Sequence, residues 1–547
     1  PRAVLQEARG FGSEVKAGDL EGRTDCRHHD VITIDPADAK DFDDAFYLEP
    51  AKDKRWKLWV HIADVSHYVK PGTALDTEAR QRGNSTYLVD RVIPMLPEAL
   101  SNELCSLKPE VDRLTKCVEF LLEDDGSVVR ARCYQAVIHS KRRFSYEEAF
   151  AVIEGRAEDR IEGMLQDANR LAQRVRKLRM RNGSLELDFP ETKIILDDRG
   201  RVDRIEQVDY DESHQLIEEF MLLANEAVAG RLMKLKRPSI YRIHEAPNEL
   251  RLKEYREEVL SHDIPCGNLS RPGEVNKLLK RLGTLTIGPA LKIGFLKSLM
   301  RARYAIDPIG HYGLAKKKYA HFTSPIRRYA DLIVHRSLFE QGALKNADLR
   351  SAADHISATE RNSADAERDS KTVKLYAYLE SQLKSGSPHP YRALVTDLRN
   401  FGFFVDVPDL GMSGLVPLSK LDDDFYELDP ARNLIQGRRR RRTIQLGDEL
   451  TVQVLSVDSA KRQVDFRLAG TGDEKGGSRK KRGTGKGSSR KQTSRKSGKK
   501  GRKSSGTQDN TKEASSKRPS RKQASRGKSA AKKTSRKRSS RRRKRSS

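Results

Sequence analysis

The sequence predicts an α/β (α+β) body, followed by a five-stranded β-barrel and an unstructured basic tail. After a polar lead-in over residues 1–30, strand-like and amphipathic helical runs share residues 31–387, which indicates a mixed domain. Five short strand-like runs fall within residues 388–470, a spacing typical of a small barrel. Residues 471–547 contain no Leu, Ile, Val, Met, Phe, Tyr or Trp, so we expect this segment to be disordered.

An acidic loop between two strands opens the predicted body. Residues 31–34 (VITI) have the pattern of a buried strand, and residues 45–48 (AFYL) resume it. Residues 35–44 hold five aspartates, and four of them are the candidate ligands between these runs: Asp35, Asp41, Asp43 and Asp44. Crowded carboxylates raise one another's pKa, and a divalent cation such as Mg²⁺, which prefers oxygen ligands, removes that repulsion. The loop therefore predicts a divalent-cation site, with a solvated acidic turn as the alternative.

Helical patterns follow in the same body. Ser145 and Glu148 are spaced as a capping box, in which each side chain bonds the other residue's backbone N–H. Apolar residues then recur at helical spacing from 165 to 178, and the Asn-Gly pair at 182–183 ends the pattern. Residues 214–233 form a further amphipathic helix. These runs supply the helical layer of the predicted fold.

A later segment combines a helix start with two arginines. Thr323-Ser324-Pro325 favours the first turn of a helix, because Ser and Thr cap helices and Pro is tolerated there. Arg327 and Arg328 would then lie at a helix N-terminus, where the backbone N–H groups already attract anions. A guanidinium group there can bind a phosphate through two parallel hydrogen bonds. A surface arginine pair is the alternative.

The predicted barrel follows the body. Its strands are expected at residues 391–395, 401–407, 414–418, 451–458 and 463–468. Between the third and fourth of these runs lies the stretch from Arg438 to Arg442, five consecutive arginines. We expect this stretch to form a basic loop beside the barrel that contacts phosphates.

Almost all of the net charge of +28 lies in the tail. Residues 471–547 hold 31 Lys and Arg against four Asp and Glu, whereas the first 470 residues hold 75 and 74. A flexible polycation binds nucleic acid without sequence preference and with a strong salt dependence. The charge therefore indicates a polyanionic partner for the tail, and the body before it is nearly neutral.

The cysteines and the hydropathy of the sequence indicate the cellular compartment of the protein. The cysteines are Cys26, Cys105, Cys117, Cys133 and Cys266. They form no CxxC pair and no zinc-type spacing, and such a scattered, odd-numbered set indicates reduced thiols in the cytoplasm. No apolar run reaches 18 residues and no signal peptide is evident. We expect a cytoplasmic protein with no membrane partner.

Three motifs resemble one known family. TIDPADAKDFDDA at 33–45, HIADVSHYV at 61–69 and HYGLAKKKYAHFTSPIRRYADLIVHR at 311–336 are similar to the signatures of the RNB-domain exoribonucleases, ribonuclease II and ribonuclease R, with greater likeness to ribonuclease R. The resemblance implies an RNB catalytic domain and processive 3′→5′ hydrolysis of RNA to nucleoside 5′-monophosphates, in RNA degradation and turnover. Family members usually carry cold-shock-type OB domains before this domain. None is present here, and the first residue is Pro, as a cut start would leave.

The resemblance also implies roles for the acidic loop. Metal ions, Mg²⁺ with Mn²⁺ able to substitute, would be held by Asp35, Asp41, Asp43 and Asp44. Asp43 would be the ligand whose loss most damages catalysis. Arg327 would stabilise the charge that develops on the scissile phosphate.

Further residues would hold the last nucleotide. Tyr87 matches the aromatic residue that stacks on the terminal base in the family, a contact open to any sequence because every base has a π-face. Glu219 matches the glutamate that contacts the last nucleotide, and Arg328 would also bind RNA. A second stacking residue belongs near position 187. This sequence has Leu187 there, with Phe189 two residues later.

The barrel resembles the RNA-binding OB domain that is repeated in the large protein of the small ribosomal subunit. Phe401, Phe403 and Phe404 would offer rings to RNA bases, although part of this set must belong to the core. Many family members have His where this sequence has Pro417, so one RNA contact is absent.

We expect the chain to act as a monomer on single-stranded and structured RNA, with the tail contacting the ribosome or the RNA-decay machinery. The alternative is an RNA-binding or RNA-chaperone protein with an inert nuclease domain. A metal-dependent DNA nuclease is a third possibility, which predicts equal cutting of DNA. His61 and His67 would be alternative ligands, but imidazole suits Mg²⁺ less well than carboxylate.

Overall fold

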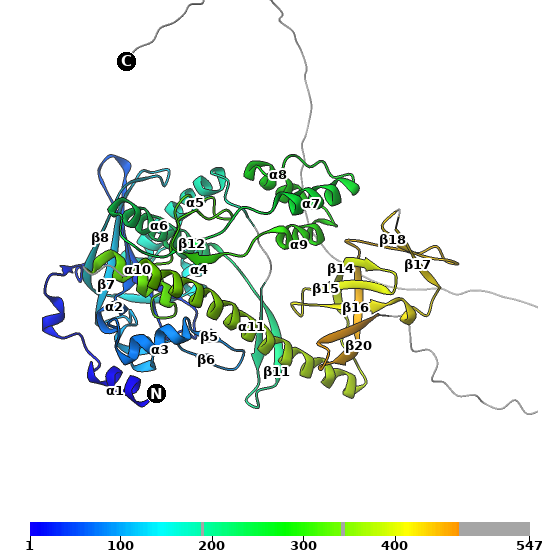
Figure 1. The fold of residues 1–547 in the computed structure, drawn as a ribbon, viewed down its shortest axis with the longest axis horizontal. Coiled ribbons are helices and arrows are strands. Elements are labelled where there is room, and N and C mark those ends of the chain that lie inside the picture. Colours follow the sequence, from blue (N-terminus) through cyan, green and yellow to red (C-terminus); the bar gives the residue numbers. More distant parts are fainter. Residues whose placement is uncertain (187–190, 341–344, 431, 470–547) are drawn as a thin grey trace, which may run out of the picture. The chain divides into compact units, whose positions relative to one another are not determined.

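A seven-stranded sheet forms the base of the body in the computed structural model, which describes residues 1–186, 191–340, 345–430 and 432–469 (Figure 1). The strand order is β1-β8-β7-β4-β3-β2-β9, and only the two edge pairs, β1 with β8 and β2 with β9, are parallel. The strands are β1 Thr24–Asp25, β2 Ile32–Asp35, β3 Asp44–Pro50, β4 Trp56–Ala63, β7 Asp112–Leu122, β8 Val128–His139 and β9 Arg142–Ser145. The predicted α+β class is confirmed.

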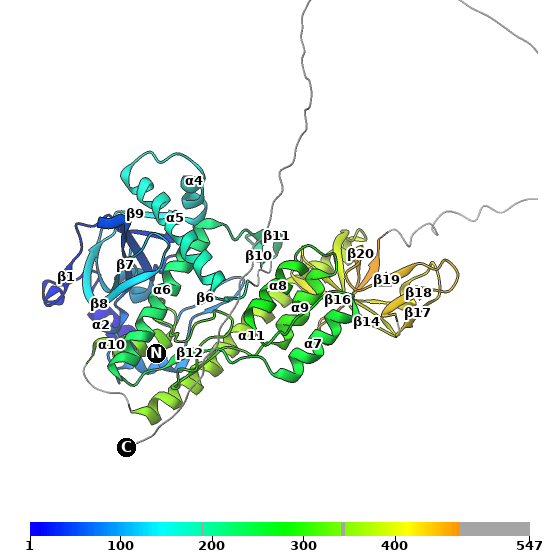
Figure 2. The same ribbon diagram turned by 90° about the horizontal axis from the view of Figure 1, so that it is seen from above.

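One face of this sheet packs against helices. Phe46, Val60 and Val118 lie opposite one another on β3, β4 and β7, and all three are wholly buried. The ring of Phe46 meets that of Phe220 on α6 (Glu212–Leu235) edge to face, with the ring centroids 5.3 Å apart. The strands thus form because alternate side chains are apolar and reach a helical layer. Figure 2 shows α5 and α6 together at this sheet.

The predicted helices are present. The capping box of Ser145 and Glu148 opens α4 (Tyr146–Glu154), and α5 (Arg160–Arg181) ends at Asn182 as its pattern predicts. The remaining helices are α1 Arg2–Gly10, α2 Val65–Tyr68, α3 Ala74–Arg82, α7 Glu249–Ser261, α8 Pro272–Leu282, α9 Gly288–Ser298, α10 Tyr329–Phe339 and α11 Asn346–Ser385. The helix α1 lies in the segment expected to be a lead-in, where the sequence shows no clear period. No helix of the described residues is both long and apolar enough to cross a membrane.

The helix expected at residues 323–325 begins later. Residues 325–327 form a turn, Arg328 makes an isolated β-bridge with Asn84, and α10 starts at Tyr329. Two backbone N–H groups of this segment donate to side chains instead: that of Ser324 to Asp331 Oδ1 and that of Ile326 to Asp43 Oδ1, each at 2.8 Å. Arg328 is therefore the residue before the helix rather than part of it.

The predicted five-stranded barrel is confirmed. Its strand order is β14-β15-β16-β21-β20, and the barrel is closed. The strands are β14 Tyr391–Arg399, β15 Gly402–Val407, β16 Met412–Pro417, β20 Glu449–Asp458 and β21 Gln463–Leu468. Phe403, Val405, Val416, Val452 and Phe466 fill its interior.

A separate three-stranded sheet extends from the barrel and was not predicted. It comprises β17 Tyr426–Asp429, β18 Leu434–Gly437 and β19 Thr443–Gln445. In both views it lies to one side of the barrel strands (Figures 1 and 2). The stretch from Arg438 to Arg442 is the turn between β18 and β19, so the expected basic loop is the tip of a hairpin.

Two-stranded sheets complete the described part. They are β5 Thr86–Tyr87 with β6 Val92–Ile93, β10 Glu191–Leu196 with β11 Val202–Val208, and β12 Tyr241–Ile243 with β13 Arg303–Ala305. The β5–β6 pair has a direct bearing on the site, because it carries Tyr87.

Candidate active site

The sheet brings the ends of the acidic loop together. The strands β2 and β3 pair antiparallel with Ile32 opposite Phe46, so Asp35 at the end of β2 and Asp44 at the start of β3 lie at the same edge. Asp43 directly precedes β3, and its carbonyl accepts the N–H of Ala63 at 2.9 Å. Three of the four predicted carboxylates thus have positions fixed by strand pairing.

Side chains from outside hold the loop itself. The Ser106 hydroxyl accepts the N–H of Phe42 at 3.0 Å and donates to the carbonyl of Lys40 at 2.8 Å. The Arg143 guanidinium donates to the carbonyl of Pro36 at 2.6 Å. These bonds satisfy backbone groups that a loop would otherwise leave to water, so the aspartates project from a fixed frame.

Asp43 joins the acidic loop to the arginine segment. This carboxylate is only 4% exposed, and its Oδ1 accepts the N–H of Ile326. Its Oδ2 lies 3.6 Å from Nε of Arg327, whose Nη2 donates to the Ser324 hydroxyl at 3.0 Å. The structure therefore brings together two motifs that are far apart in the sequence.

The carboxylates need positive charge. Burial raises the pKa of Asp35, and the charges of Asp44 and Asp43 raise it further. Burial likewise raises the pKa of Asp41, Asp43 and Asp44, while Arg327 lowers each of them by less. Two buried oxygens, Asp35 Oδ2 and Asp43 Oδ2, have no hydrogen-bond partner. A crowded cluster of buried carboxylates fits a divalent cation, which supplies positive charge and accepts oxygen ligands.

A cavity of about 280 Å³ adjoins this cluster and holds three predicted residues. Tyr87, Arg327 and Arg328 line it. The Tyr87 side chain is partly open, its residue being 39% exposed, and its backbone N–H donates to Glu367 at 3.0 Å. Burial raises the pKa of the Tyr87 hydroxyl to about 12, so it stays neutral at ordinary pH. An aromatic face and an arginine thus border one space beside the carboxylates.

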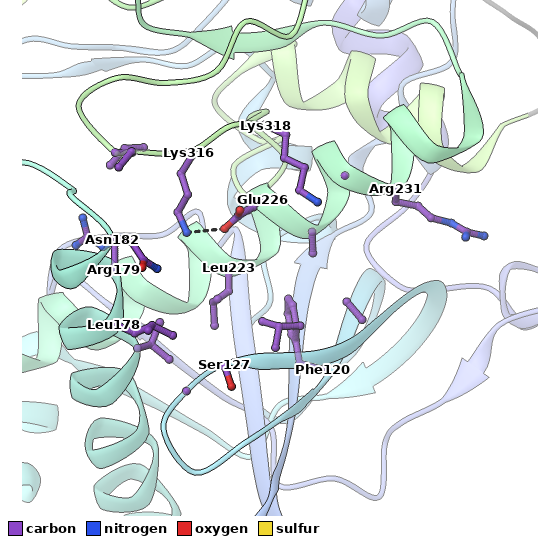
Figure 3. A pocket seen from close by; sticks show the side chains of 18 of the residues that line it. Phe120, Ser127, Leu178, Arg179, Asn182, Leu223, Glu226, Arg231, Lys316 and Lys318 are labelled. Carbon is purple, nitrogen blue, oxygen red and sulfur yellow. Dashed lines mark hydrogen bonds and ion pairs between the residues drawn. The ribbon is translucent and has the colours of Figure 1, made fainter. Parts of the chain in front are cut away.

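A larger cavity lies elsewhere. Figure 3 shows it between the β7–β8 strands, helices α5 and α6, and the segment that carries Lys316 and Lys318. Its volume is about 580 Å³, and an ion pair between Lys316 and Glu226 crosses it. It contains no predicted site residue. We place the site beside the smaller cavity, because Arg327, which lines that cavity, lies 3.6 Å from the Asp43 carboxylate.

Comparison with known proteins identifies the family. The model of the RNB domain matches residues 23–341, more than half of the chain, and that of the S1 RNA binding domain matches residues 391–468. The chain belongs to the ribonuclease R family. Ribonuclease R of Thermotoga maritima is 39% identical over 498 residues, which cover 87% of this chain and 69% of the relative.

Other relatives agree. Ribonuclease R of Vibrio parahaemolyticus is 37% identical over 510 residues, covering 89% of this chain and 60% of its own. The chain thus spans about 60% of the length of that relative. Mycoplasma genitalium RNase R, solved in complex with ribose-methylated single-stranded RNA, has a TM-score of 0.78 at 28% identity, covering 86% of this chain and 75% of its own.

The glutamate expected at the last nucleotide lies in an ion pair. Glu219 is 1% exposed, and Arg179 Nη2 lies 2.5 Å from its Oε1. Its neighbour Glu218 is more open, with a side chain 34% exposed. In this conformation Glu219 offers no oxygen to RNA, so the prediction needs correction: its observed role is to hold Arg179. Leu187 and Phe189, where a second stacking residue was sought, lie outside the described residues.

Arg328 is held by a residue that the ribonuclease R motifs did not single out. Asp331 is wholly buried, and both of its oxygens accept from the Arg328 guanidinium at 2.9 Å. Asp331 also accepts the N–H of Ser324, so one carboxylate orders the whole turn. The spacing of three residues between Arg328 and Asp331 at a helix start was the available signal. Arg328 still lines the cavity but with part of its donors in use.

An aromatic pair beside the carboxylates was also missed. The ring of Tyr146 stacks on that of His214 with centroids 3.8 Å apart. Burial raises the pKa of Tyr146, and the nearby charges of Asp44 and Asp35 raise it further. The sequence analysis assigned Tyr146 only to a helix start, because nothing in a local pattern shows that it faces the aspartates.

The three predicted phenylalanines of the barrel differ in their exposure to solvent. Phe401 is 54% exposed, Phe404 is half-buried, and Phe403 is wholly buried in the barrel core. The prediction that Phe403 stacks on RNA is therefore wrong, because alternate residues of a strand point to opposite faces and Phe403 points inward. Phe425, which was not predicted, is 62% exposed next to the arginine hairpin.

Proposed function

We propose that the chain is a 3′→5′ exoribonuclease that hydrolyses RNA processively to nucleoside 5′-monophosphates during RNA turnover. The observation that carries this proposal is the contact of Asp43 with Ile326 and Arg327, because it joins a crowded carboxylate cluster to a phosphate-binding side chain. Membership of the ribonuclease R family supports the same reaction.

Each residue has a distinct part in the proposed reaction. Asp35, Asp41, Asp43 and Asp44 would hold a divalent cation, which when bound activates water and neutralises charge on the phosphate. Arg327 would bind the scissile phosphate, since the described contacts occupy only part of its guanidinium. Tyr87 would stack on the terminal base, and the cavity wall would keep the last nucleotide in line.

We further propose Mg²⁺ as the metal, with Mn²⁺ able to substitute, because an all-carboxylate site suits these hard cations.

Single-stranded RNA is the proposed substrate, and structured RNA is a second one, supported by the arginine hairpin and the basic tail. The tail would also contact the ribosome or the RNA-decay machinery, and the chain would act as a monomer. A cytoplasmic location is supported by five cysteines that are all free thiols.

An inert RNA-binding protein is the alternative. The barrel, the arginine hairpin and the tail would all serve such a protein equally well. The carboxylate cluster argues against it, since an RNA-binding function gives no reason for burying unpartnered carboxylates.

The proposal is tested with a 5′-labelled single-stranded RNA and its DNA equivalent, each with Mg²⁺ or chelator, for the wild type and Asp43→Asn. We expect a Mg²⁺-dependent ladder from RNA alone, and a loss of at least about a hundredfold in kcat for the variant with RNA affinity retained. Asn keeps the acceptor for the Ile326 N–H, so the fold should survive. Tight binding without cleavage by the wild type would establish the inert alternative, and equal cutting of DNA would establish a nuclease without sugar selectivity.

A further inference from the structure

A second cluster of metal-type side chains lies on the other face of the seven-stranded sheet. Cys26, His29 and His61 each offer a ligand atom, and these three atoms lie within 4.8 Å of one another. A fourth donor adjoins them, because Cys117 Sγ is 4.0 Å from Nε2 of His61. Cys26, His61 and Cys117 are each no more than 1% exposed. We call these four residues the Cys–His cluster.

The strand register builds this cluster. His61 on β4 lies directly opposite Cys117 on β7, and Cys117 lies opposite Tyr134 on β8, so the three side chains share one face. This row is offset by one residue from the row of Val60 and Val118, which faces α6. The cluster therefore lies on the sheet face away from that helix.

The segment that follows β1 supplies the other two donors. The N–H of Cys26 donates to the carbonyl of Val137 on β8 at 2.9 Å, and the N–H of His29 donates to the carbonyl of Cys26 at 3.1 Å. This turn brings a Cys-x-x-His pair over the sheet. The His29 ring stacks on Tyr47 with centroids 4.6 Å apart. Sequence spacing alone could not show the cluster, since its donors come from three distant segments.

The two imidazole rings of the cluster each have a nitrogen available for a metal. Nδ1 of His61 is paired with the Thr115 hydroxyl at 3.1 Å, so Nε2, which meets Cys117 Sγ at 4.0 Å, is the nitrogen that faces the other donors. Nδ1 of His29 is buried and has no hydrogen-bond partner. A buried imidazole nitrogen without a partner is costly unless something binds it.

We propose that Cys26, His29, His61 and Cys117 bind one structural Zn²⁺ ion. Two thiolates and two imidazoles are the donor set of closed tetrahedral zinc sites, and such sites hold donors about 3.3–3.8 Å apart. The separations among Cys26, His29 and His61 need to close by up to about 1.5 Å, and Cys117 Sγ, which lies 4.0 Å from Nε2 of His61, must also move toward Cys26 and His29. The two thiols would bind as thiolates, so binding releases two protons to solvent. Hard cations such as Mg²⁺ would prefer the carboxylate cluster instead.

The ion would fasten the segment of residues 26–29 to the centre of the sheet. That segment runs directly into β2, which ends at Asp35. A bound Zn²⁺ would therefore stabilise the strand that carries Asp35, a predicted ligand of the catalytic metal, without taking part in the reaction. The site does not depend on the proposed function, because the cluster is defined by other residues and its test measures metal and stability.

The test measures zinc in full-length protein grown with added zinc, purified with a tag that lacks histidine, and dialysed. We expect about one zinc per chain in the wild type and nearly none in Cys26→Ser or His61→Ala. Cys133→Ser is the matched control, because Cys133 lies on β8 next to Tyr134 and points to the opposite face. It should keep its zinc, as should Asp43→Asn, which excludes binding at the carboxylate cluster.

Two further measurements use only the wild type and so survive a variant that fails to fold. Removing zinc with a chelator should lower the melting temperature, and added Zn²⁺, but not Mg²⁺, should restore it. Replacing zinc with Co²⁺ should give the absorption of tetrahedral cobalt together with a thiolate charge-transfer band. The proposal is overturned if the dialysed wild type holds no zinc, if all variants hold equal zinc, or if the cobalt spectrum lacks the thiolate band.

Discussion

The side chains of the candidate active site differ in the contacts that hold them in the structure without RNA. Asp43 is fixed by the Ile326 N–H, and Arg328 is occupied by Asp331. Tyr87, in contrast, is fixed only through its backbone, and its ring lines an open cavity. Asp43, proposed to hold the cation, is thus fixed in advance, whereas the open ring is the one proposed to accept any base.

Tyr87→Ala should therefore weaken binding of a short single-stranded RNA. Loss of one stacking ring costs about 1–3 kcal/mol, which corresponds to roughly 5- to 150-fold in Kd. The measurement is fluorescence anisotropy in an Asp43→Asn background, which does not cut the RNA. Tyr87→Phe keeps the aromatic ring, so its Kd for the RNA should stay close to that of the protein with Tyr87. Equal weakening by Ala and Phe would contradict stacking.

A second residue-scale prediction concerns Asp64, which is wholly buried near the end of β4. Arg23 Nη2 lies 2.7 Å from its Oδ2, and Lys116 Nζ lies 3.3 Å from its Oδ1. Burial raises the pKa of Asp64, but the charges of Lys116 and Arg23 outweigh it and hold the pKa well below its usual range. The stabilisation is complete above about pH 4 and is lost as the pH falls, because the folded protein must then take up a proton against these charges.

Asp64→Asn should lower the free energy of unfolding at pH 7 by about 3–5 kcal/mol, since it leaves buried cations unpaired. Between about pH 4 and pH 2, its unfolding free energy should fall less steeply than that of the wild type, by up to about 1.4 kcal/mol per pH unit. Urea denaturation at several pH values gives both numbers. Asp198→Asn, a control at an exposed position, should keep the wild-type dependence of the unfolding free energy on pH.

At the scale of elements, the hairpin between β18 and β19 presents a cluster of arginines in a defined shape. The Asp424 carboxylate accepts the N–H groups of Phe425, Arg439 and Arg440 at 2.6–3.1 Å, which fixes the turn. The guanidinium of Arg438 lies over the exposed ring of Phe425, 4.7 Å from its centroid. An acidic residue thus orders the backbone and leaves the arginine heads toward solvent.

Replacing the arginines at 439–441 with Gln should reduce the slope of log K against log salt by about two to three for RNA binding. Each phosphate contact contributes about 0.9 to that slope for a duplex and about 0.7 for a single strand. Arg9, Arg130 and Arg156 are exposed elsewhere, and replacing them with Gln removes the same charge. An equal loss of slope in this control would mean that the hairpin has no special contact with RNA.

The local sequence pattern predicted the helices and strands whose signals lie within a few residues. It missed the features that depend on contacts between residues far apart in the sequence. The capping box at Ser145, the end of α5 and the five barrel strands follow from spacing alone. The start of α10 was misplaced because Thr323-Ser324-Pro325 also suits the turn that precedes the helix, and a local pattern does not show that the Ile326 N–H bonds Asp43 far away in the chain. The carboxylate set was found from sequence because its members are neighbours. The roles of Glu219 and Phe403 were not found from sequence, because their burial depends on which face of the helix or strand meets the core.

At the scale of the whole molecule, charge is unevenly distributed: a nearly neutral body precedes a tail with a net charge of +27 over residues 471–547. Such a polycation raises the local concentration of RNA without reading its sequence. The barrel and the arginine hairpin supply contacts of defined geometry, so the tail would add affinity rather than selectivity.

Deletion of residues 471–547 should weaken RNA binding at low salt and flatten its salt dependence. Turnover of a short single strand at saturating concentration should remain, because the proposed site lies wholly within residues 1–469. Filter binding across a salt series and a single-turnover assay measure the two effects. Unchanged affinity at low salt would show that the tail serves another partner.

The hydrogen bond from Ile326 to Asp43 spans 283 residues of sequence. Closing so long a loop costs conformational entropy before any contact repays it, so contacts of this kind form late in folding. A growing chain would display all four aspartates long before the segment that completes their surroundings has been made. In this molecule, competence to cut RNA would therefore be acquired in one late step, after nearly the whole catalytic domain has left the messenger-bound ribosome that is making it.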